Sequence, residues 1–296
     1  MCGQSPAGII VQAKSMWSNF LQALINCWLL ATGKRLDTEE HSWLKGPVSN
    51  TAIVGDDFYS QYARQSGLSV AKEVGAGLLT DFNQVLLKED RNREKLNPRI
   101  AKFYENTSQY TLEVWSQWRG PVQFFAKLLI KGLSRKMQQM NIPLNPLESS
   151  HGMSSEVIPL ENAQGNRETT CWLRKSIKTG NVVYAGFYSA CWLPELNNHC
   201  VKVVFPLPKG NVTVLLKVLV QEDGSVKLVS HGSKLGQPGY YRIRTLGGSK
   251  AVLKYIPLKE IIHVYEDAEG TLRTDHQFFF LGSRFLDLHY KISQKV

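Results

Sequence analysis

The sequence predicts an α+β fold, in which a helical amino-terminal part packs on a large, strongly curved antiparallel sheet or barrel formed by the carboxyl-terminal half. Three observations support this prediction. Apolar residues recur at helical spacing up to residue 141, residues 142–169 are broken by prolines and glycines, and short β-branched and aromatic runs follow. We therefore divide the chain into residues 1–50 (an amphipathic helix and a flexible linker), 51–141 (a helical region), 142–169 (a linker) and 170–296 (the sheet or barrel).

In the amino-terminal region, Ile9–Leu30 is predicted to form an amphipathic helix, because Trp17, Leu24 and Trp28 recur at helical spacing. Such an apolar stripe usually faces the core of its own domain, and we favour that interpretation. The alternative is a helix that docks on a membrane surface or on a partner. Residues 32–50 are polar and contain two glycines and a proline, which predicts a loop or linker.

The middle region predicts further helices. Asp56–Lys88 has helical spacing in two pieces that are separated near Gly67. Asn97 precedes a proline, a pair typical of a helix start, and apolar spacing continues from there to Trp118. A last helix, Pro121–Asn141, is the most basic. Together with the amino-terminal helix it suggests a weak association with anionic membranes.

Beyond residue 169, ten strands are predicted from β-branched and aromatic runs that are separated by turn residues. Short connections make neighbouring strands antiparallel, and ten in succession favour a curved sheet or barrel. One strand, Val212–Val220, is apolar on both faces, so we expect the amino-terminal helices to cover part of the sheet. The predicted strands are Thr170–Ile177, Val182–Ala190, Cys200–Phe205, Val212–Val220, Val226–Ser230, Tyr240–Thr245, Val252–Ile256, Glu260–Tyr265, Leu272–Phe280 and Phe285–Ile292.

The last two strands are expected to form a hairpin, in which successive side chains point to opposite faces. Matching their apolar faces requires a loop with an odd number of residues, or a bulge. A three-residue loop sets His276 opposite Leu288 and Asp275 opposite His289, whereas a five-residue loop sets His276 opposite Tyr290. In both registers His276 points inward and His289 points outward.

A two-residue loop at Gly282 and Ser283 would instead bring both histidines to one face, where a histidine dyad or a metal site is conceivable. It would also expose Phe278, whose full burial contributes about 1.5–3 kcal/mol. We therefore reject this register and predict no metal. The cysteines predict no metal site either, because His199 and Cys200 are adjacent on a strand and point to opposite faces.

His276 is the principal site candidate, since it is a titratable group on an otherwise apolar inner face. We predict that this face binds a hydrophobic or amphipathic small molecule between the sheet and the helices, without a cofactor. One alternative is a core histidine bonded to a neighbour. Another is an acid–base enzyme (a lyase, isomerase or hydrolase) that uses His276 with Tyr290 or Tyr188. The predicted ligand-binding residues are His276, Phe278, Phe280, Leu288, Tyr290 and Tyr188.

Composition adds weaker constraints. The formal net charge is +10, but basic residues are scattered among acids, so we expect a solvated surface and no specific nucleic-acid partner. Five cysteines at irregular spacing predict reduced thiols in a cytoplasmic protein. The first residues lack a positively charged region and the following apolar run contains polar residues, so neither a signal peptide nor a membrane span is expected. A peripheral-membrane or scaffold role through the two helices is a third class of function.

Overall fold

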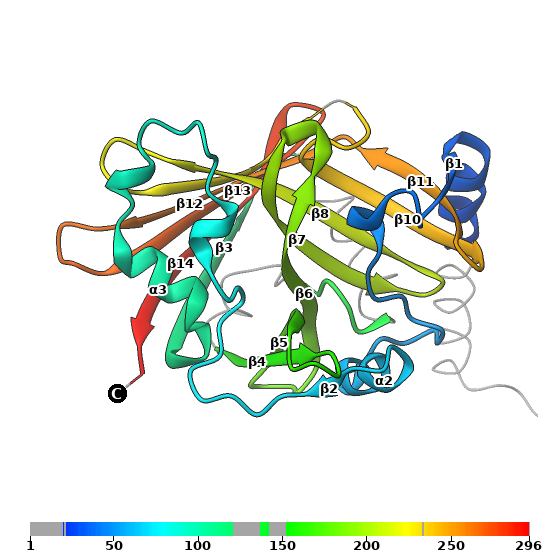
Figure 1. Ribbon diagram of the computed structural model, residues 1–296, viewed down its shortest axis with the longest axis horizontal. Coiled ribbons are helices and arrows are strands. Elements are labelled where there is room, and N and C mark those ends of the chain that lie inside the picture. Colours follow the sequence, from blue (N-terminus) through cyan, green and yellow to red (C-terminus); the bar gives the residue numbers. More distant parts are fainter. Residues whose placement is uncertain (1–19, 21, 121–136, 142–151, 233, 296) are drawn as a thin grey trace, which may run out of the picture.

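The computed structural model describes residues 20, 22–120, 137–141, 152–232 and 234–295 (Figure 1). Within them the α+β composition is confirmed, because the α-helices lie in the amino-terminal part and the strands form one 14-stranded antiparallel sheet. The predicted Pro121–Asn141 helix lies almost entirely outside the described residues. The helical segments are residues 22–32, α2 (Phe58–Gln65), α3 (Pro98–Glu105) and the 3-10 turns Ser42–Leu44, Phe82–Val85, Arg93–Lys95, Thr107–Gln109 and Pro194–Leu196.

All ten strands predicted beyond residue 169 are confirmed, with ends that differ by a few residues, and four further strands precede them. The strands are β1 (Lys34–Asp37), β2 (Ser69–Val70), β3 (Tyr110–Trp118), β4 (Met153–Glu161), β5 (Arg167–Ser176), β6 (Val182–Leu193), β7 (Asn198–Leu207), β8 (Gly210–Val220), β9 (Val226–Ser230), β10 (Gly239–Gly247), β11 (Lys250–Ile256), β12 (Leu258–Glu266), β13 (Leu272–Phe280) and β14 (Ser283–Gln294).

The sheet branches at β8. Residues 210–215 of this strand pair with β10, whereas residues 217–220 pair with β9. The main path of paired strands is β2-β4-β5-β6-β7-β8-β9-β12-β13-β14-β3, and a side branch runs from β8 through β10 and β11 to β1. The path is open at β2 and β3, so the predicted barrel is wrong, and the strong curling is not found. A barrel needs one constant stagger round all its strands, which a branching sheet does not have.

The predicted helix from Asn97 to Trp118 is correct only in its first half. α3 begins as expected, with the side chain of Asn97 accepting a hydrogen bond from the Arg99 amide. The second half is β3, at one end of the main path and paired with β14. In β3 Val114 and Ser116 are buried while the intervening side chains are exposed, which is the two-residue alternation of a strand.

Two predicted assignments around α2 and β4 also need correction. Asp56–Lys88 contains α2, but the piece after Gly67 holds the strand β2 and the 3-10 turn Phe82–Val85 in place of a second α-helix. Residues 142–169, predicted as a linker, contain β4. This strand tolerates Pro159 because the carbonyl of this residue faces the β2 side of β4, where it accepts from the Ala71 amide. Proline has no backbone N–H to donate on that side, but β2 is only two residues long and pairs with Leu160 and Glu161, so no hydrogen bond between the strands is lost at Pro159.

The amino-terminal segment differs from expectation in its packing. Residues 22–30 are helical as predicted, and the earlier part of Ile9–Leu30 lies mainly outside the described residues. The side chain that faces the domain is Leu29, which is fully buried, whereas Leu24 and Trp28 are about half exposed. The following residues are not a free linker, because β1 pairs with β11 and Trp43 packs edge-on against a buried tyrosine of β10.

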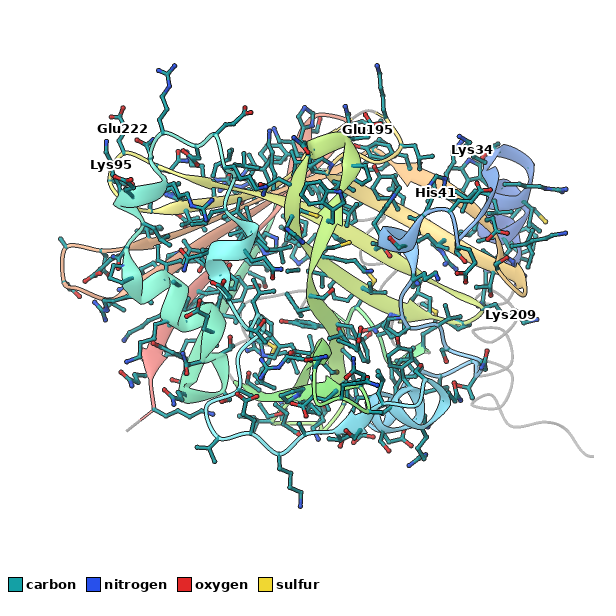
Figure 2. All side chains as sticks on the ribbon, in the orientation of Figure 1. Lys34, His41, Lys95, Glu195, Lys209 and Glu222 are labelled. Atoms are coloured by element: carbon teal, nitrogen blue, oxygen red, sulfur yellow. The ribbon has the colours of Figure 1, made fainter. Side chains whose placement is uncertain are left out.

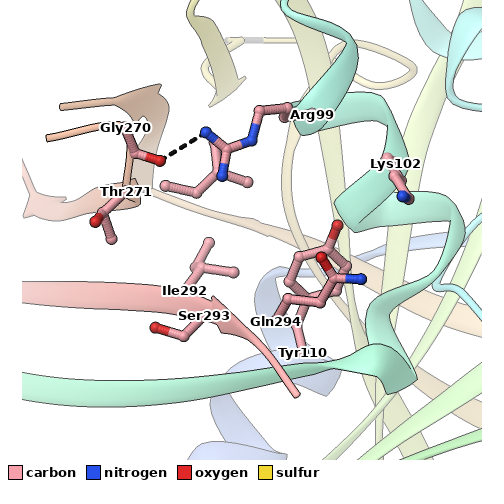
Figure 3. A pocket seen from close by; sticks show the side chains of 9 residues that line it. Arg99, Lys102, Tyr110, Gly270, Thr271, Ile292, Ser293 and Gln294 are labelled. Atoms are coloured by element: carbon pink, nitrogen blue, oxygen red, sulfur yellow. Dashed lines mark hydrogen bonds between the residues drawn. The ribbon is translucent and has the colours of Figure 1, made fainter. Parts of the chain in front are cut away.

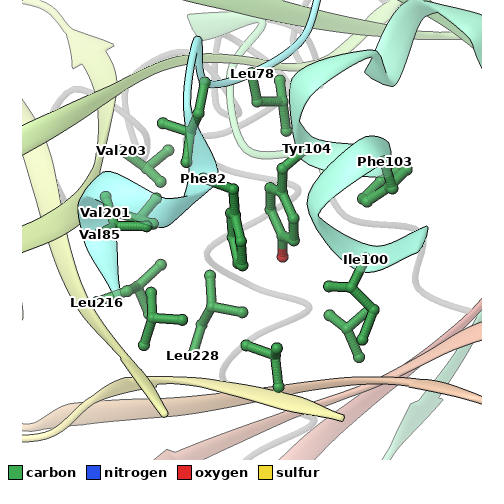
Figure 4. Close-up of a cluster of buried hydrophobic side chains, with 14 of the residues drawn as sticks. Leu78, Phe82, Val85, Ile100, Phe103, Tyr104, Val201, Val203, Leu216 and Leu228 are labelled. Atoms are coloured by element: carbon green, nitrogen blue, oxygen red, sulfur yellow. The ribbon is translucent and has the colours of Figure 1, made fainter. Parts of the chain in front are cut away.

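The main hydrophobic core lies on what we call the inner face of the sheet, the side that contacts α3 and the 3-10 turn Phe82–Val85 (Figure 4). Phe82 stacks on Tyr104 of α3 with ring centroids 4.7 Å apart. Alternate residues of β8 enter this core, while Leu215 lies in a second cluster on the other face. The predicted burial of β8 on both faces is therefore confirmed.

The β13–β14 hairpin has the predicted register. His276 lies opposite Leu288, and its side chain is 13% exposed. His289 lies on the other face, where it is more exposed. A bulge after Phe278 supplies the extra residue that matching the apolar faces requires. The inward position of His276 is thus confirmed.

The turn of this hairpin is strained at Leu281. Leu281 and Gly282 have φ values of 49° and 84°, the signature of a type I′ turn, which favours asparagine at its first position. Because Leu281 is 71% exposed, replacing it loses little packing. We expect Leu281→Asn to raise the free energy of unfolding by about 0.5–1 kcal/mol in urea denaturation. Val74→Asn, at a fully exposed position without positive φ, is the control; an equal gain there would contradict the explanation.

Candidate functional site

A buried polar group is centred on His276. Its Nε2 lies 3.0 Å from Oε2 of Glu260, and the two side chains are only 13% and 7% exposed. The hydroxyl of Tyr240 donates to the same carboxylate oxygen at 2.5 Å. Three strands, β10, β12 and β13, thus bring one imidazole, one carboxylate and one phenol together on the inner face.

The local pattern of β12 explains why the carboxylate is buried. Leu258, Glu260, Ile262 and Val264 alternate along the strand and therefore share the inner face. The position of Glu260 is also fixed by β9, because its backbone amide donates a hydrogen bond to the hydroxyl of Ser230 at 2.9 Å. Sequence reasoning missed Glu260 and Tyr240, although a carboxylate at an inward position of an apolar strand was a readable signal.

Tyrosines extend this group across the inner face. Burial raises the pKa of Tyr188 in β6, of Tyr240 and of Tyr290 in β14, and the negative charge of Glu260 raises each of them further. These phenols therefore remain protonated at neutral pH and can act as hydrogen-bond donors. Tyr188 and Tyr290 are nevertheless only half-buried.

Arg174 of β5 is a second charged residue on this face. It is 1% exposed, and its Nε and Nη2 atoms have no hydrogen-bond partner in the part of the chain that the structure describes. Its guanidinium carbon lies 5.4 Å from the centroid of the Trp172 ring. Burial raises the pKa of Tyr184, its cross-strand partner, and the positive charge of Arg174 opposes part of that rise.

The structure brings most of the predicted ligand-binding residues together. The His276 ring lies 4.1 Å from the Phe278 ring and 6.3 Å from the Tyr290 ring, measured between centroids. Phe278 and Leu288 are buried in one small cluster. Phe280 is partly exposed at the end of β13. Tyr188 comes from β6, which is not adjacent to β13 or β14, but it packs against the same hydrophobic core as Tyr290.

Chemically, this arrangement can hold a proton between His276, Glu260 and Tyr240, and it can offer donors to a polar ligand atom. The predicted acid–base roles of His276 and Tyr290 stay predictions. His289 belongs to a separate outer pair, with its Nδ1 2.7 Å from Oδ1 of Asp275. Within the described residues, no three His, Cys, Asp or Glu side chains are grouped to hold a metal ion.

A small surface pocket of about 210 Å³ lies elsewhere, where α3 meets the ends of β13 and β14 (Figure 3). Arg99, Lys102 and Tyr110 line one side of it. Arg99 donates to the Gly270 carbonyl and is paired with Glu266, so its charge is already engaged. The pocket lining includes none of the residues bonded to Glu260.

Comparisons with known proteins give one distant relative. No family model matches the sequence, and no solved structure matches it. The chain is 25% identical over 279 residues to an uncharacterized membrane protein, YndJ, of Bacillus subtilis (strain 168). The match covers 92% of this chain and 47% of YndJ, so the chain spans about half the length of that relative. Among the helices described, none has the length and apolar character that crossing a membrane requires.

The Tyr240–Glu260 hydrogen bond gives a prediction for stability. Tyr240→Phe leaves a buried carboxylate short of one donor, so we expect the free energy of unfolding to fall by about 1.5–3 kcal/mol. Tyr290→Phe, which removes a phenol of the same face outside this hydrogen bond, is the matched control and is expected to cost less. Chemical denaturation of both variants measures the difference. Equal losses in the two variants would show that the hydrogen bond to Glu260 contributes no more to the free energy of unfolding than the hydroxyl of Tyr290 does.

Proposed function

We propose that the chain binds a hydrophobic or amphipathic small molecule on the inner face of the sheet, beside α3. The observation that carries the proposal is a face where half-buried aromatic rings surround a few buried polar groups. Ligand sites are typically built in this way, with an apolar lining and a small number of polar atoms that orient the ligand. A core that served stability alone would bury fewer polar groups, since each costs free energy unless it is bonded.

The proposed ligand would contact strands that are far apart in the order of the sheet. Tyr290 of β14 and Tyr184 of β6 both pack against the main hydrophobic core, and Arg174 of β5 lies opposite Tyr184. These strands are not neighbours in the main path, in which β7, β8, β9, β12 and β13 separate β6 from β14. A ligand between them would contact both sides of the inner face.

Oleyl alcohol, a neutral amphiphile, tests this function. Trp172 is a built-in reporter, because its ring centroid lies 5.7 Å from that of Tyr188. We expect saturable changes in tryptophan fluorescence, and Tyr188→Ala is expected to weaken binding about tenfold through the lost aromatic contact. The control is Tyr59→Ala, which alters a ring packed in a different cluster.

Native mass spectrometry of the purified protein complements the titration, since a tightly held natural ligand would be seen as added mass. The proposal is wrong if no bound small molecule is detected and oleyl alcohol gives no saturable signal.

The exposed side of the amino-terminal helix favours a second role, at a membrane surface. Phe20, Leu24 and Trp28 are spaced four residues apart, and about half of each is exposed. The Lys254 amine lies 5.4 Å from the Trp28 ring, and Lys34 is the first residue of β1, shortly after the helix ends (Figure 2). An apolar stripe bordered by cations suits an anionic lipid surface. The relative YndJ is named as a membrane protein, which agrees with this role. We also propose that the protein is cytoplasmic, so that it would contact the membrane from that side.

Vesicle co-sedimentation tests the membrane role. With vesicles of equal phosphatidylglycerol and phosphatidylcholine at low salt, we expect the double variant Leu24→Ser, Trp28→Ser to lose most of its binding, because the buried apolar area drives insertion. The control changes two apolar residues exposed elsewhere, Ile177→Ser and Leu281→Ser. If the wild-type protein stays in the supernatant under these conditions, this role is excluded.

A further inference from the structure

We propose that the ligand of the inner face carries a carboxylate, and that the Nε and Nη2 edge of Arg174 binds it. This inference rests on the proposed ligand-binding function and names the chemistry of the polar end of the ligand. Arg174 is 1% exposed, yet these two nitrogens have no partner among the described residues. A buried guanidinium with free N–H groups is strongly unfavourable, so a site that keeps one is ready for an anion.

The identity of the two free atoms selects the anion. Nε and Nη2 lie on the same edge of the planar guanidinium, and their N–H groups point in parallel. This edge matches the two oxygens of a carboxylate, which it can bind through two hydrogen bonds at once. A neutral hydroxyl offers a single uncharged acceptor atom, so it cannot form two straight, parallel hydrogen bonds with this edge.

The surroundings hold this edge in place. The guanidinium lies over the Trp172 ring, a position favoured by the attraction between a cation and an aromatic face. Trp172 is itself fixed, because its Nε1 donates to the hydroxyl of Ser155 at 2.7 Å. Arg174 is therefore oriented before any ligand arrives, which reduces the entropy that binding would otherwise lose.

The carboxylates around Arg174 are engaged with other groups. Glu260, on the same face, already accepts from Tyr240 and His276. Glu156 of β4 lies next to the strand position opposite Arg174, but it pairs with Lys175 at 3.0 Å. The guanidinium also has a hydrogen bond with the Tyr184 hydroxyl, so what is left for a group from outside the described residues is the Nε and Nη2 edge.

A second unpartnered group lies on the same face of β5. Thr170 is fully buried, and its hydroxyl has no partner among the described residues. Alternation along the strand places Thr170, Trp172 and Arg174 on one side. Thr170 also lies directly opposite Tyr188. The polar end of the ligand would therefore meet Arg174 and Thr170, and its apolar part would lie along the tyrosines.

The test compares oleic acid with oleyl alcohol, which share one chain and differ in the head group. In titrations of the full chain at pH 8, we expect the wild type to bind the acid at least about tenfold more tightly than the alcohol. Arg174→Met keeps the length of the side chain without its donors, and it is expected to abolish this preference, because the acid loses two hydrogen bonds to the guanidinium and the alcohol loses at most one. Arg174→Lys keeps the charge but loses the paired edge, and should give an intermediate preference.

Thermal unfolding separates ligand binding from a structural role. Without ligand, Arg174→Met should melt at the wild-type temperature or above it, since the variant removes an unpaired buried charge. Oleic acid should raise the Tm of the wild type but not that of the variant. Arg242→Met is the matched control, because Arg242 is also buried but donates to the Asn211 carbonyl at 3.0 Å. It should melt lower and keep the preference for the acid.

The outcomes distinguish this inference from the function on which it rests. An unchanged preference for the acid in Arg174→Met overturns the inference and leaves the proposed function intact. A lower Tm of ligand-free Arg174→Met, with oleic acid bound as before, assigns Arg174 a structural role and also overturns it. If neither probe binds the wild type, the proposed function fails and the inference fails with it.

Discussion

The structure depends on one constraint, that the strands of the main hydrophobic core must keep one apolar set of alternate residues on the inner face. A shift of pairing by one residue would turn the whole set outward. In β12 this constraint carries Glu260 inward with its apolar neighbours, and in β13 it carries His276 inward beside Phe278. The polar groups are thus held in apolar surroundings by the residues around them, and their hydrogen bonds to one another replace the lost water.

Packing elements decide which part of the inner face remains available. α3 and the 3-10 turn Phe82–Val85 fill the region over β7, β8 and β9, where the strand residues are almost completely buried. Toward β6 and β14 the tyrosines at 184, 188 and 290 are only half-buried. Branching of the sheet at β8 contributes as well, because it places Tyr240 of the side branch against Glu260 of the main path.

Local signals explain which features the sequence could predict. The strands beyond residue 169 and the inward position of His276 follow from alternation and turn residues, which act over short distances. β3 was misassigned because Val114 and Trp118 are spaced four residues apart, a spacing that fits both a helix and one face of a strand. Glu260 could have been found from its inward position in β12, but its hydrogen bond to Tyr240 could not, because the contact between β10 and β12 depends on the branch, which no local pattern encodes.

The two inner charges described here, Glu260 and Arg174, differ in how the fold satisfies them. Glu260 accepts two hydrogen bonds, so its burial is compensated within the chain. Arg174 lies over an aromatic ring and leaves one edge without a partner. Apolar replacements of buried charges are often neutral or stabilising, so stability alone gives little reason to keep this arginine. A bound molecule that supplies the missing partner would explain why this arginine is buried with one edge free. The aromatic side chains beside it indicate where the rest of that molecule would lie.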